Sequence, residues 1–133
     1  MSPIIVRNFI DKETAEHHAK RMDENLALGN YDDGQSPKAW SWYGLQFDLL
    51  EEKTEHMCEL TGLSLLPSYD YCRLYYKGSY LEPHTDRGSC EVSVTINLKN
   101  VDEPWEFFWE GGSCKMNQGD AVIYLGKEIK HWR

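Results

Sequence analysis

Apolar residues recur at helical spacing in the first part of the chain. The segment at residues 3–9, with Ile4, Ile5 and Val6, predicts a short strand, and the apolar positions between Thr14 and Leu28 then keep one face of a helix. Asp11 has the position and side chain of an N-cap, and Gly29 follows the last apolar position of this pattern. The pattern therefore predicts a strand followed by a helix that Gly29 ends.

A second helix is expected within residues 40–60. Gly, Asp and Asn are frequent in the preceding residues 30–37, which predicts a loop. Gly62 is a natural helix stop, whereas the Trp-Ser-Trp-Tyr-Gly segment at residues 40–44 is compatible with either a helix or an extended chain. The apolar face of this helix is expected to consist of Tyr43, Phe47, Leu50 and Met57.

After residue 65 the pattern changes to short aromatic and β-branched runs separated by Gly, Pro, Asn or Asp. The runs at residues 69–76, 91–98, 105–109 and 121–125 predict strands, with Glu110-Gly-Gly as a hairpin turn after the third run. Helices followed by consecutive strands are typical of an α+β fold with an antiparallel sheet or barrel. No repeat or low-complexity segment interrupts the pattern, so residues 1–133 are expected to form one domain.

Charge and composition narrow the possible partners. The chain has 14 basic and 22 acidic residues and a net charge of −8, so it repels phosphate backbones and nucleic acid is not expected as a partner. No apolar stretch reaches the ~18 residues of a membrane span, and the N-terminal residues lack the pattern of a secretory signal. We therefore expect no membrane partner and a cytoplasmic location.

The four cysteines are scattered without a Cys-x-x-Cys pair. That spacing is not the usual one for zinc, and a disulfide would need an oxidising compartment that nothing else in the sequence indicates. Free thiols behave as small apolar groups. We expect reduced and mostly buried side chains at Cys58, Cys72, Cys90 and Cys114.

The segment Tyr80-Leu-Glu-Pro-His-Thr-Asp-Arg carries the most informative chemistry. His84 and Asp86 are separated by one residue, so on an extended chain both side chains point to the same face. A strand after Gly119 leads to a further histidine, His131, 47 residues after His84. Two histidines and one carboxylate on one face form a facial triad, which suits non-haem Fe(II) and leaves three coordination positions open.

Two predicted strands alternate polar and apolar residues. Tyr71, Arg73 and Tyr75 share one face of the first strand, while Ser93, Thr95 and Asn97 share one face of the second. Aliphatic residues occupy the opposite face of the second strand between Val92 and Leu98. The polar face therefore lines a site or faces solvent.

These segments together resemble a known family. Residues 71–87, 89–98, 119–126 and the His-Trp-Arg segment at 131–133 look like the blocks of a small Fe(II)- and 2-oxoglutarate-dependent oxygenase of the prolyl-4-hydroxylase-like type, as in compact viral and bacterial members. The resemblance implies a double-stranded β-helix, which is a jelly-roll or cupin-like barrel, with the N-terminal helices packed on its outer face. For a viral member the location would be the host cytoplasm.

The resemblance also implies a reaction and its ligands. His84, Asp86 and His131 match the iron ligands, and Tyr75 matches a strand tyrosine that often lies beside 2-oxoglutarate. Such enzymes convert 2-oxoglutarate and O₂ to succinate and CO₂ while they hydroxylate a C–H bond, with ascorbate as a possible reductant. The implied substrate is a prolyl or other peptidyl side chain, and a small molecule is the alternative.

One part of the family pattern is absent. Relatives place an Arg or Lys about ten residues after the distal His to hold the far carboxylate of 2-oxoglutarate, and the sequence ends two residues after His131. The chain is then either a fragment without its final strand, or another residue holds this carboxylate. Arg73 and Arg133 are the candidate cations, with a slight preference for Arg73, and Tyr75 and Asn97 are candidate hydrogen-bond donors.

Two other functional classes fit the same sequence. A cupin-like protein would use the triad to bind Zn²⁺ or Mn²⁺ without oxygenase activity. A catalytically silent interaction domain would have lost its hold on the cosubstrate. Release of succinate, which depends on both Fe(II) and 2-oxoglutarate, distinguishes these classes from an oxygenase.

Overall fold

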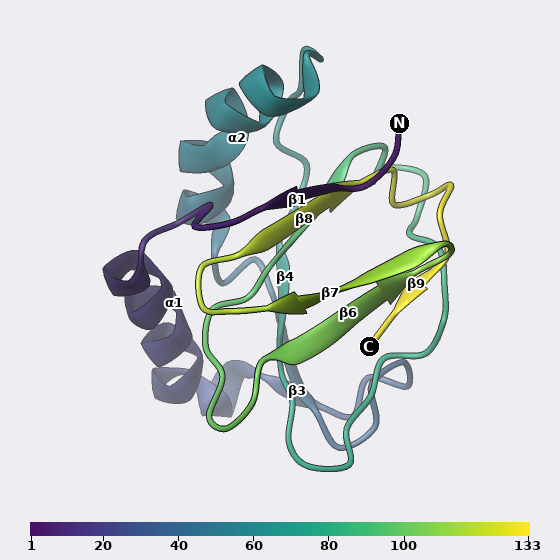
Figure 1. Ribbon diagram of the computed structural model, residues 1–133. Coiled ribbons are helices and arrows are strands. Elements are labelled where there is room, and N and C mark those ends of the chain that lie inside the picture. Colours follow the sequence, from purple (N-terminus) through teal and green to yellow (C-terminus); the bar gives the residue numbers. More distant parts are fainter.

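Strand β8 (Ala121–Tyr124) lies at the centre of the protein, and all four of its residues are buried in the computed structural model, which describes residues 1–133. It pairs with β1 (Ile4–Val6) on one edge and with β5 (Ser93–Ile96) on the other, antiparallel in both cases. Figure 1 shows β1 and β8 running side by side across the middle of the molecule. The N-terminal segment is therefore fixed to a strand near the other end of the chain.

Two more three-stranded sheets follow the same antiparallel rule. Their orders are β7 (Gly112–Met116)–β6 (Trp105–Trp109)–β9 (His131–Trp132) and β2 (Asn30–Tyr31)–β3 (Trp40–Tyr43)–β4 (Tyr71–Leu74). Gly111, with φ at +97°, forms the hairpin turn between β6 and β7, as expected. The prediction of an α+β protein with antiparallel strands after residue 65 is confirmed.

Helix α1 (Lys12–Glu24) begins where the sequence predicts and ends earlier. The Asp11 side chain accepts a hydrogen bond from the backbone N–H of Thr14 at 2.7 Å, as an N-cap should. The expected end at Gly29 is wrong, because Asn25 ends the helix by donating from its amide to the Arg21 carbonyl at 2.7 Å. Residues Leu26–Leu28 form a separate 3₁₀ turn.

Helix α2 (Phe47–Thr61) starts later than residue 40 because β3 occupies the tryptophan-rich segment. Gly62, with φ at +72°, ends the helix as predicted. The predicted apolar face is partly wrong: Tyr43 belongs to β3 and is 64% exposed, and Phe47 is also exposed. Leu49 and Met57 are the helix residues that are buried.

The main core lies between the helices and one face of the central sheet. Ala15 of α1 and Leu49 and Met57 of α2 pack with Ala121 and Ile123 of β8 in one apolar cluster. The aliphatic residues between Val92 and Leu98 pack against the same cluster, so the apolar face of β5 points toward the helices. Figure 1 accordingly shows both helices on one side of the sheets.

The buried carboxylate of Asp120 explains why β1 stops at Val6 although the sequence predicts a strand as far as residue 9. It accepts hydrogen bonds from the backbone N–H of Asn8 at 3.1 Å and of Asn117 at 3.0 Å, and it pairs with Arg7 at 2.6 Å. Asn8 takes a left-handed conformation, with φ at +53°, which ends the extended chain. One carboxylate thus joins the end of β1 to the turn before β8.

The cysteines correct one expectation. All four are free, but only Cys114 is buried and the other three are half-buried. Their sulfur atoms have polar neighbours: Cys58 accepts from the Leu65 backbone N–H at 3.3 Å, and Cys90 lies 2.9 Å from the Tyr69 hydroxyl. Cys58 and Cys90 therefore act partly as hydrogen-bonding groups at the edge of the core, whereas Cys114 is buried in an apolar cluster.

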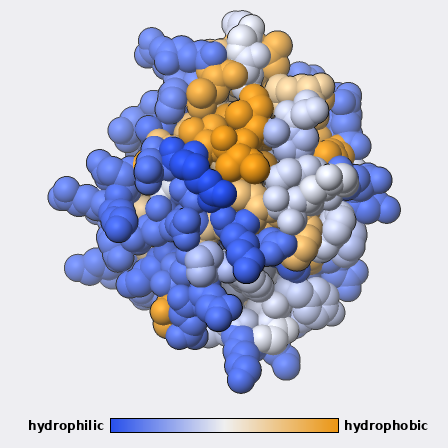
Figure 2. Space-filling view, viewed as in Figure 1, coloured by the Kyte–Doolittle hydropathy of each residue, from blue (hydrophilic) through white to orange (hydrophobic).

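Hydrophilic residues cover most of the visible surface in Figure 2, and hydrophobic residues gather in the upper middle, where β1 and β8 lie in Figure 1. Ile5 of β1 and Met1 are exposed large hydrophobic residues of this region of the chain. Neither helix has the length and apolarity needed to cross a membrane.

Replacement of Asp120 tests the connection between β1 and β8. Asp120→Ala leaves two backbone N–H groups without their acceptor, and we expect a loss of roughly 2–4 kcal/mol in the free energy of unfolding. Urea unfolding measures this loss. The control is Asp23→Ala, an exposed residue of α1, and an equal effect of both substitutions would contradict the role given to Asp120.

Candidate metal centre

The backbones of His84 and His131 are paired directly. The His84 N–H donates to the His131 carbonyl at 3.1 Å, and the His131 N–H donates to the His84 carbonyl at 2.9 Å. His131 belongs to β9, which pairs on its other edge with β6 through Trp109. Two histidines that are 47 residues apart in sequence are therefore held opposite each other by main-chain bonds.

A β-bulge lies beside this pair. Leu81 and Arg133 also exchange two backbone hydrogen bonds, at 3.0 and 3.1 Å. Between the two bonded pairs, Glu82 and Pro83 lie opposite the single residue Trp132, which is the pattern of a bulge. Pro83 has no N–H to lose there, and the extra residue sets which way the His84 side chain points.

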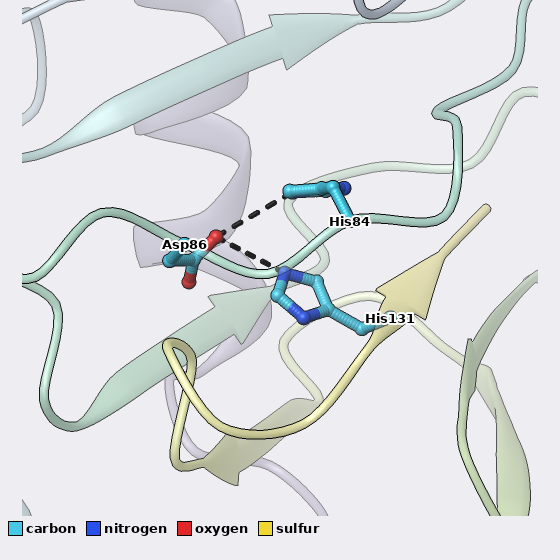
Figure 3. Close-up of side chains that lie close together, drawn as sticks. All are labelled: His84, Asp86 and His131. Carbon is cyan, nitrogen blue, oxygen red and sulfur yellow. Dashed lines mark hydrogen bonds and ion pairs between the residues drawn. The ribbon is translucent and has the colours of Figure 1, made fainter.

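The side chains of His84, Asp86 and His131 converge at one point (Figure 3). Asp86 Oδ1 lies 3.1 Å from His131 Nε2 and 3.4 Å from His84 Nε2, and one ligand atom from each residue lies within 4.8 Å of the others. The convergence of these three residues, expected from their spacing, is thus present. Two imidazoles and one carboxylate are a donor set that holds a divalent metal with open positions.

Backbone carbonyls orient both imidazoles. His84 Nδ1 donates to the Glu82 carbonyl at 2.7 Å, and His131 Nδ1 donates to the Ile129 carbonyl at 2.9 Å. Each Nδ1 therefore carries a proton, which leaves the Nε2 lone pair of the neutral ring free to bind a metal. The two Nε2 atoms are the ones that face Asp86.

Charge holds the cluster together in the absence of metal. Burial by itself raises the pKa of Asp86, but its contacts with His131, His84 and Ser93 hold that pKa well below the usual value of 3.8. The hydrogen bond with Asp86 raises the pKa of His84 above 6.5, against the opposing effect of burial. The Asp86 carboxylate is therefore ionised at every physiological pH and attracts a cation bound beside it.

The polar face of β5 is the face of the central sheet that is turned toward the His84–Asp86–His131 cluster. The Ser93 hydroxyl donates to Asp86 Oδ2 at 2.8 Å, and the Thr95 hydroxyl lies 2.9 Å from that of Tyr124. Asn97 lies one residue beyond β5, and its amide donates to the Met116 carbonyl at 3.2 Å. The predicted alternation is confirmed, since the aliphatic residues of β5 face the helices instead.

Arg133 is a half-buried residue whose guanidinium group has a buried Nε and no anionic partner. Aromatic rings surround its guanidinium group: the rings of Tyr75, Trp105 and Phe107 have their centres 5.9, 5.6 and 5.9 Å from its Cζ atom. Its Nη2 atom lies 3.3 Å from the Met116 sulfur, and its buried Nε has no hydrogen-bond partner. Burial lowers the pKa of Arg133 from 12.5.

Arg73, the cation that the sequence favoured slightly, is already paired. Its Nη2 donates to Asp33 Oδ2 at 2.9 Å and to Gln35 Oε1 at 3.1 Å. Burial opposes the charged form, but Tyr75 and Asp33 outweigh it and raise the pKa of Arg73. The sequence predicts Arg73 and Tyr75 on one face of the same strand. Strand β4 ends at Leu74, so Tyr75 lies outside it.

Tyr124 is the site residue that the sequence reasoning missed. Its ring centre lies 4.6 Å from that of His131, and burial raises the pKa of its hydroxyl. The alternation of residues along β8 could have indicated this position. Ala121 and Ile123 pack in the core beneath the helices, whereas Val122 and Tyr124 pack in a second cluster with Phe107. Asp33, the partner of Arg73, gave no such signal because it lies in a loop.

Comparison with known proteins supports the fold alone. No family profile matches the chain, and no curated protein matches its sequence. The crystal structure of a prolyl-4-hydroxylase from Pseudomonas putida superposes with a TM-score of 0.70 and 16% sequence identity, over 98% of this chain and 83% of that one. The chain therefore has a fold like that of a prolyl-4-hydroxylase.

A histidine titration tests the electrostatics of the metal-free cluster. Asp86→Asn removes the main cause of the raised pKa of His84, so we expect that pKa to fall. The attraction in the native protein is complete between about pH 3.8 and 6.5, and it is lost as the pH rises through the raised pKa of His84 or falls through the lowered pKa of Asp86.

NMR of the imidazole Cε1–H signals as a function of pH measures this change. Asp23→Asn is the matched control, because Asp23 is exposed and lies on α1. An unchanged His84 titration in Asp86→Asn would show that the carboxylate does not act on the imidazole.

Proposed function

We propose that this protein is a non-haem Fe(II)- and 2-oxoglutarate-dependent dioxygenase that hydroxylates a C–H bond. The observation that carries the proposal is the proximity of two features: a cluster of two histidines and one aspartate, and an arginine whose guanidinium has a buried Nε and no anionic partner. Phe107 connects them, since its ring lies 5.9 Å both from the His131 ring and from Arg133 Cζ. A prolyl-4-hydroxylase-like fold agrees with this reading.

The three ligand residues fit Fe(II). His84 and His131 offer nitrogen, Asp86 offers oxygen, and three protein ligands leave half of an octahedral coordination sphere for cosubstrate and O₂. When bound, Fe(II) supplies the O₂ chemistry that no protein side chain offers. The chain supplies orientation, through the carbonyls of Glu82 and Ile129, and an ionised carboxylate.

The surroundings of Arg133 fit the far carboxylate of 2-oxoglutarate. An uncompensated buried charge costs about 3–5 kcal/mol, and an incoming carboxylate would offset this cost with charge-assisted hydrogen bonds. Tyr75 lies against Arg133 and can add a hydroxyl. Asn97 is a weaker candidate because its amide already donates to Met116, and Arg73 is weaker because Asp33 already neutralises it.

The two alternatives leave Arg133 unexplained. A cupin-like protein that binds only Zn²⁺ or Mn²⁺ needs the triad but no buried cation beside it. A silent interaction domain needs neither, and an apolar residue in place of Arg133 would be less costly to bury. The unpartnered guanidinium therefore favours an oxygenase over both.

We further propose that residues 1–133 belong to one oxygenase domain, a distorted double-stranded β-helix. The antiparallel sheets β1–β8–β5 and β7–β6–β9 would form its two layers, with the second cluster, around Phe107, between them. Val122 and Tyr124 of β8 pack there with Cys114 and Met116 of β7. The helices would then cover the outside of the first layer.

Exposure separates the directions from which the two substrates approach. The His131 side chain is 3% exposed, whereas those of His84 and Asp86 are 18% and 19% exposed. The cosubstrate would lie on the buried side, toward Arg133, and the C–H substrate would approach from the side of His84 and Asp86. A prolyl peptide is the first substrate to test, a small molecule is the alternative, and ascorbate would serve as a reductant.

Activity is tested by succinate formation from 2-oxoglutarate in the presence of Fe(II), ascorbate and O₂, with and without prolyl peptides. We expect succinate release that requires Fe(II), and its loss in Asp86→Ala, which removes the carboxylate ligand but no core contact. Asp23→Ala is the control. Metal binding without any turnover of 2-oxoglutarate would instead favour the cupin-like alternative.

Cosubstrate binding distinguishes the two arginines. In Arg133→Ala we expect the binding of 2-oxoglutarate to weaken by about 2–5 kcal/mol, because a buried forked ion pair is lost. Arg73→Ala should weaken binding much less, because Arg73 is held by Asp33. Anaerobic calorimetry with the Mn(II)-loaded protein measures both affinities, and the reverse order would assign the carboxylate to Arg73.

A further inference from the structure

The carboxylate of Asp86 is fixed at both of its oxygens. Oδ1 faces the Nε2 atoms of His84 and His131, at 3.4 and 3.1 Å. Oδ2 accepts a hydrogen bond from the Ser93 hydroxyl at 2.8 Å. Ser93 is the first residue of β5, so a rigid strand holds the donor. Rotation of the carboxylate about its Cβ–Cγ bond would break this bond.

Gly126 closes the other side of the same carboxylate. A Cβ atom at this position would lie 2.2 Å from both Asp86 Oδ2 and Ser93 Oγ, and 3.0 Å from Asp86 Cγ. The Gly126 carbonyl also accepts the Asp86 N–H at 2.7 Å. The φ of Gly126 lies outside the left-handed region, so the backbone conformation does not require glycine here. Glycine is required here because the Asp86 carboxylate occupies the space that a side chain would need.

We propose that Ser93 and Gly126 are positioning residues that present Asp86 to the metal through Oδ1 alone. This inference rests on the proposed metal centre. Ser93 occupies Oδ2, and the missing side chain of Gly126 leaves room for that oxygen. A carboxylate held in this way gives one ligand atom and does not take up a second coordination position, which keeps three positions open for cosubstrate and O₂.

Removal of the Ser93 hydroxyl is the first test. In Ser93→Ala we expect the affinity for Mn(II) and Co(II), measured by anaerobic calorimetry, to fall about 10- to 100-fold, as when other hydrogen-bond partners of metal ligands are removed. We also expect a changed visible absorption spectrum of the Co(II) form, because a freed Oδ2 can become a second ligand atom. Ser89→Ala is the matched control, since Ser89 is exposed and lies in the segment between Asp86 and Ser93.

Gly126→Ala is an independent test of the same arrangement. The added methyl group displaces the carboxylate, and we expect at least as large a loss of metal affinity as in Ser93→Ala. Gly88→Ala is its control, because a Cβ at Gly88 would meet no atom within 4 Å and its φ is also outside the left-handed region. Thermal unfolding of each metal-free variant shows whether the fold is kept.

The outcomes separate this inference from the proposed function. Absence of metal binding in the native protein overturns the proposed function itself. Native affinity and an unchanged Co(II) spectrum in both Ser93→Ala and Gly126→Ala overturn the positioning role. It is also overturned if the affinity falls only as far as the metal-free variants lose folded protein, because Ser93 and Gly126 would then act on stability alone.

Discussion

The candidate centre depends on the two main-chain hydrogen bonds between His84 and His131. They hold the two imidazoles beside each other without any contribution from a metal, and the carbonyls of Glu82 and Ile129 then select the nitrogen that each ring presents. Asp86 lies two residues after His84 in the chain. The side chains add direction to a geometry that the backbone has already set, as expected of a preorganised site.

The central sheet separates two environments with one alternating pattern. The aliphatic face of β5 and half of β8 pack beneath the helices, while the other face carries the hydroxyls of Ser93, Thr95 and Tyr124 toward the histidines. Because the period of a strand is two residues, stability and chemistry are divided between odd and even positions. A core substitution on the helix side therefore need not disturb the polar side.

Much of this arrangement follows from local sequence, and the rest depends on distant partners. The His-x-Asp spacing, the cap at Asp11 and the polar face of β5 can be predicted because each depends on residues a few positions apart. The choice between Arg73 and Arg133 cannot, since it depends on Asp33, a loop residue 40 positions before Arg73. The Trp-Ser-Trp-Tyr segment is likewise a strand because β2 and β4 pair with its two edges.

The pairing of β1 with β8 has a consequence for synthesis of the chain. Ile4 lies opposite Ile123, so 119 residues must be added before the first strand can find its partner. At the usual rate of about 5–20 residues per second this takes roughly 6–24 s. During that time the aliphatic segment Ile4–Val6 is unpaired on the ribosome, while the strands of the β2–β3–β4 sheet are already available to one another. The central sheet therefore forms late in synthesis, and the His84–His131 pairing of the candidate centre needs residues that are added later still.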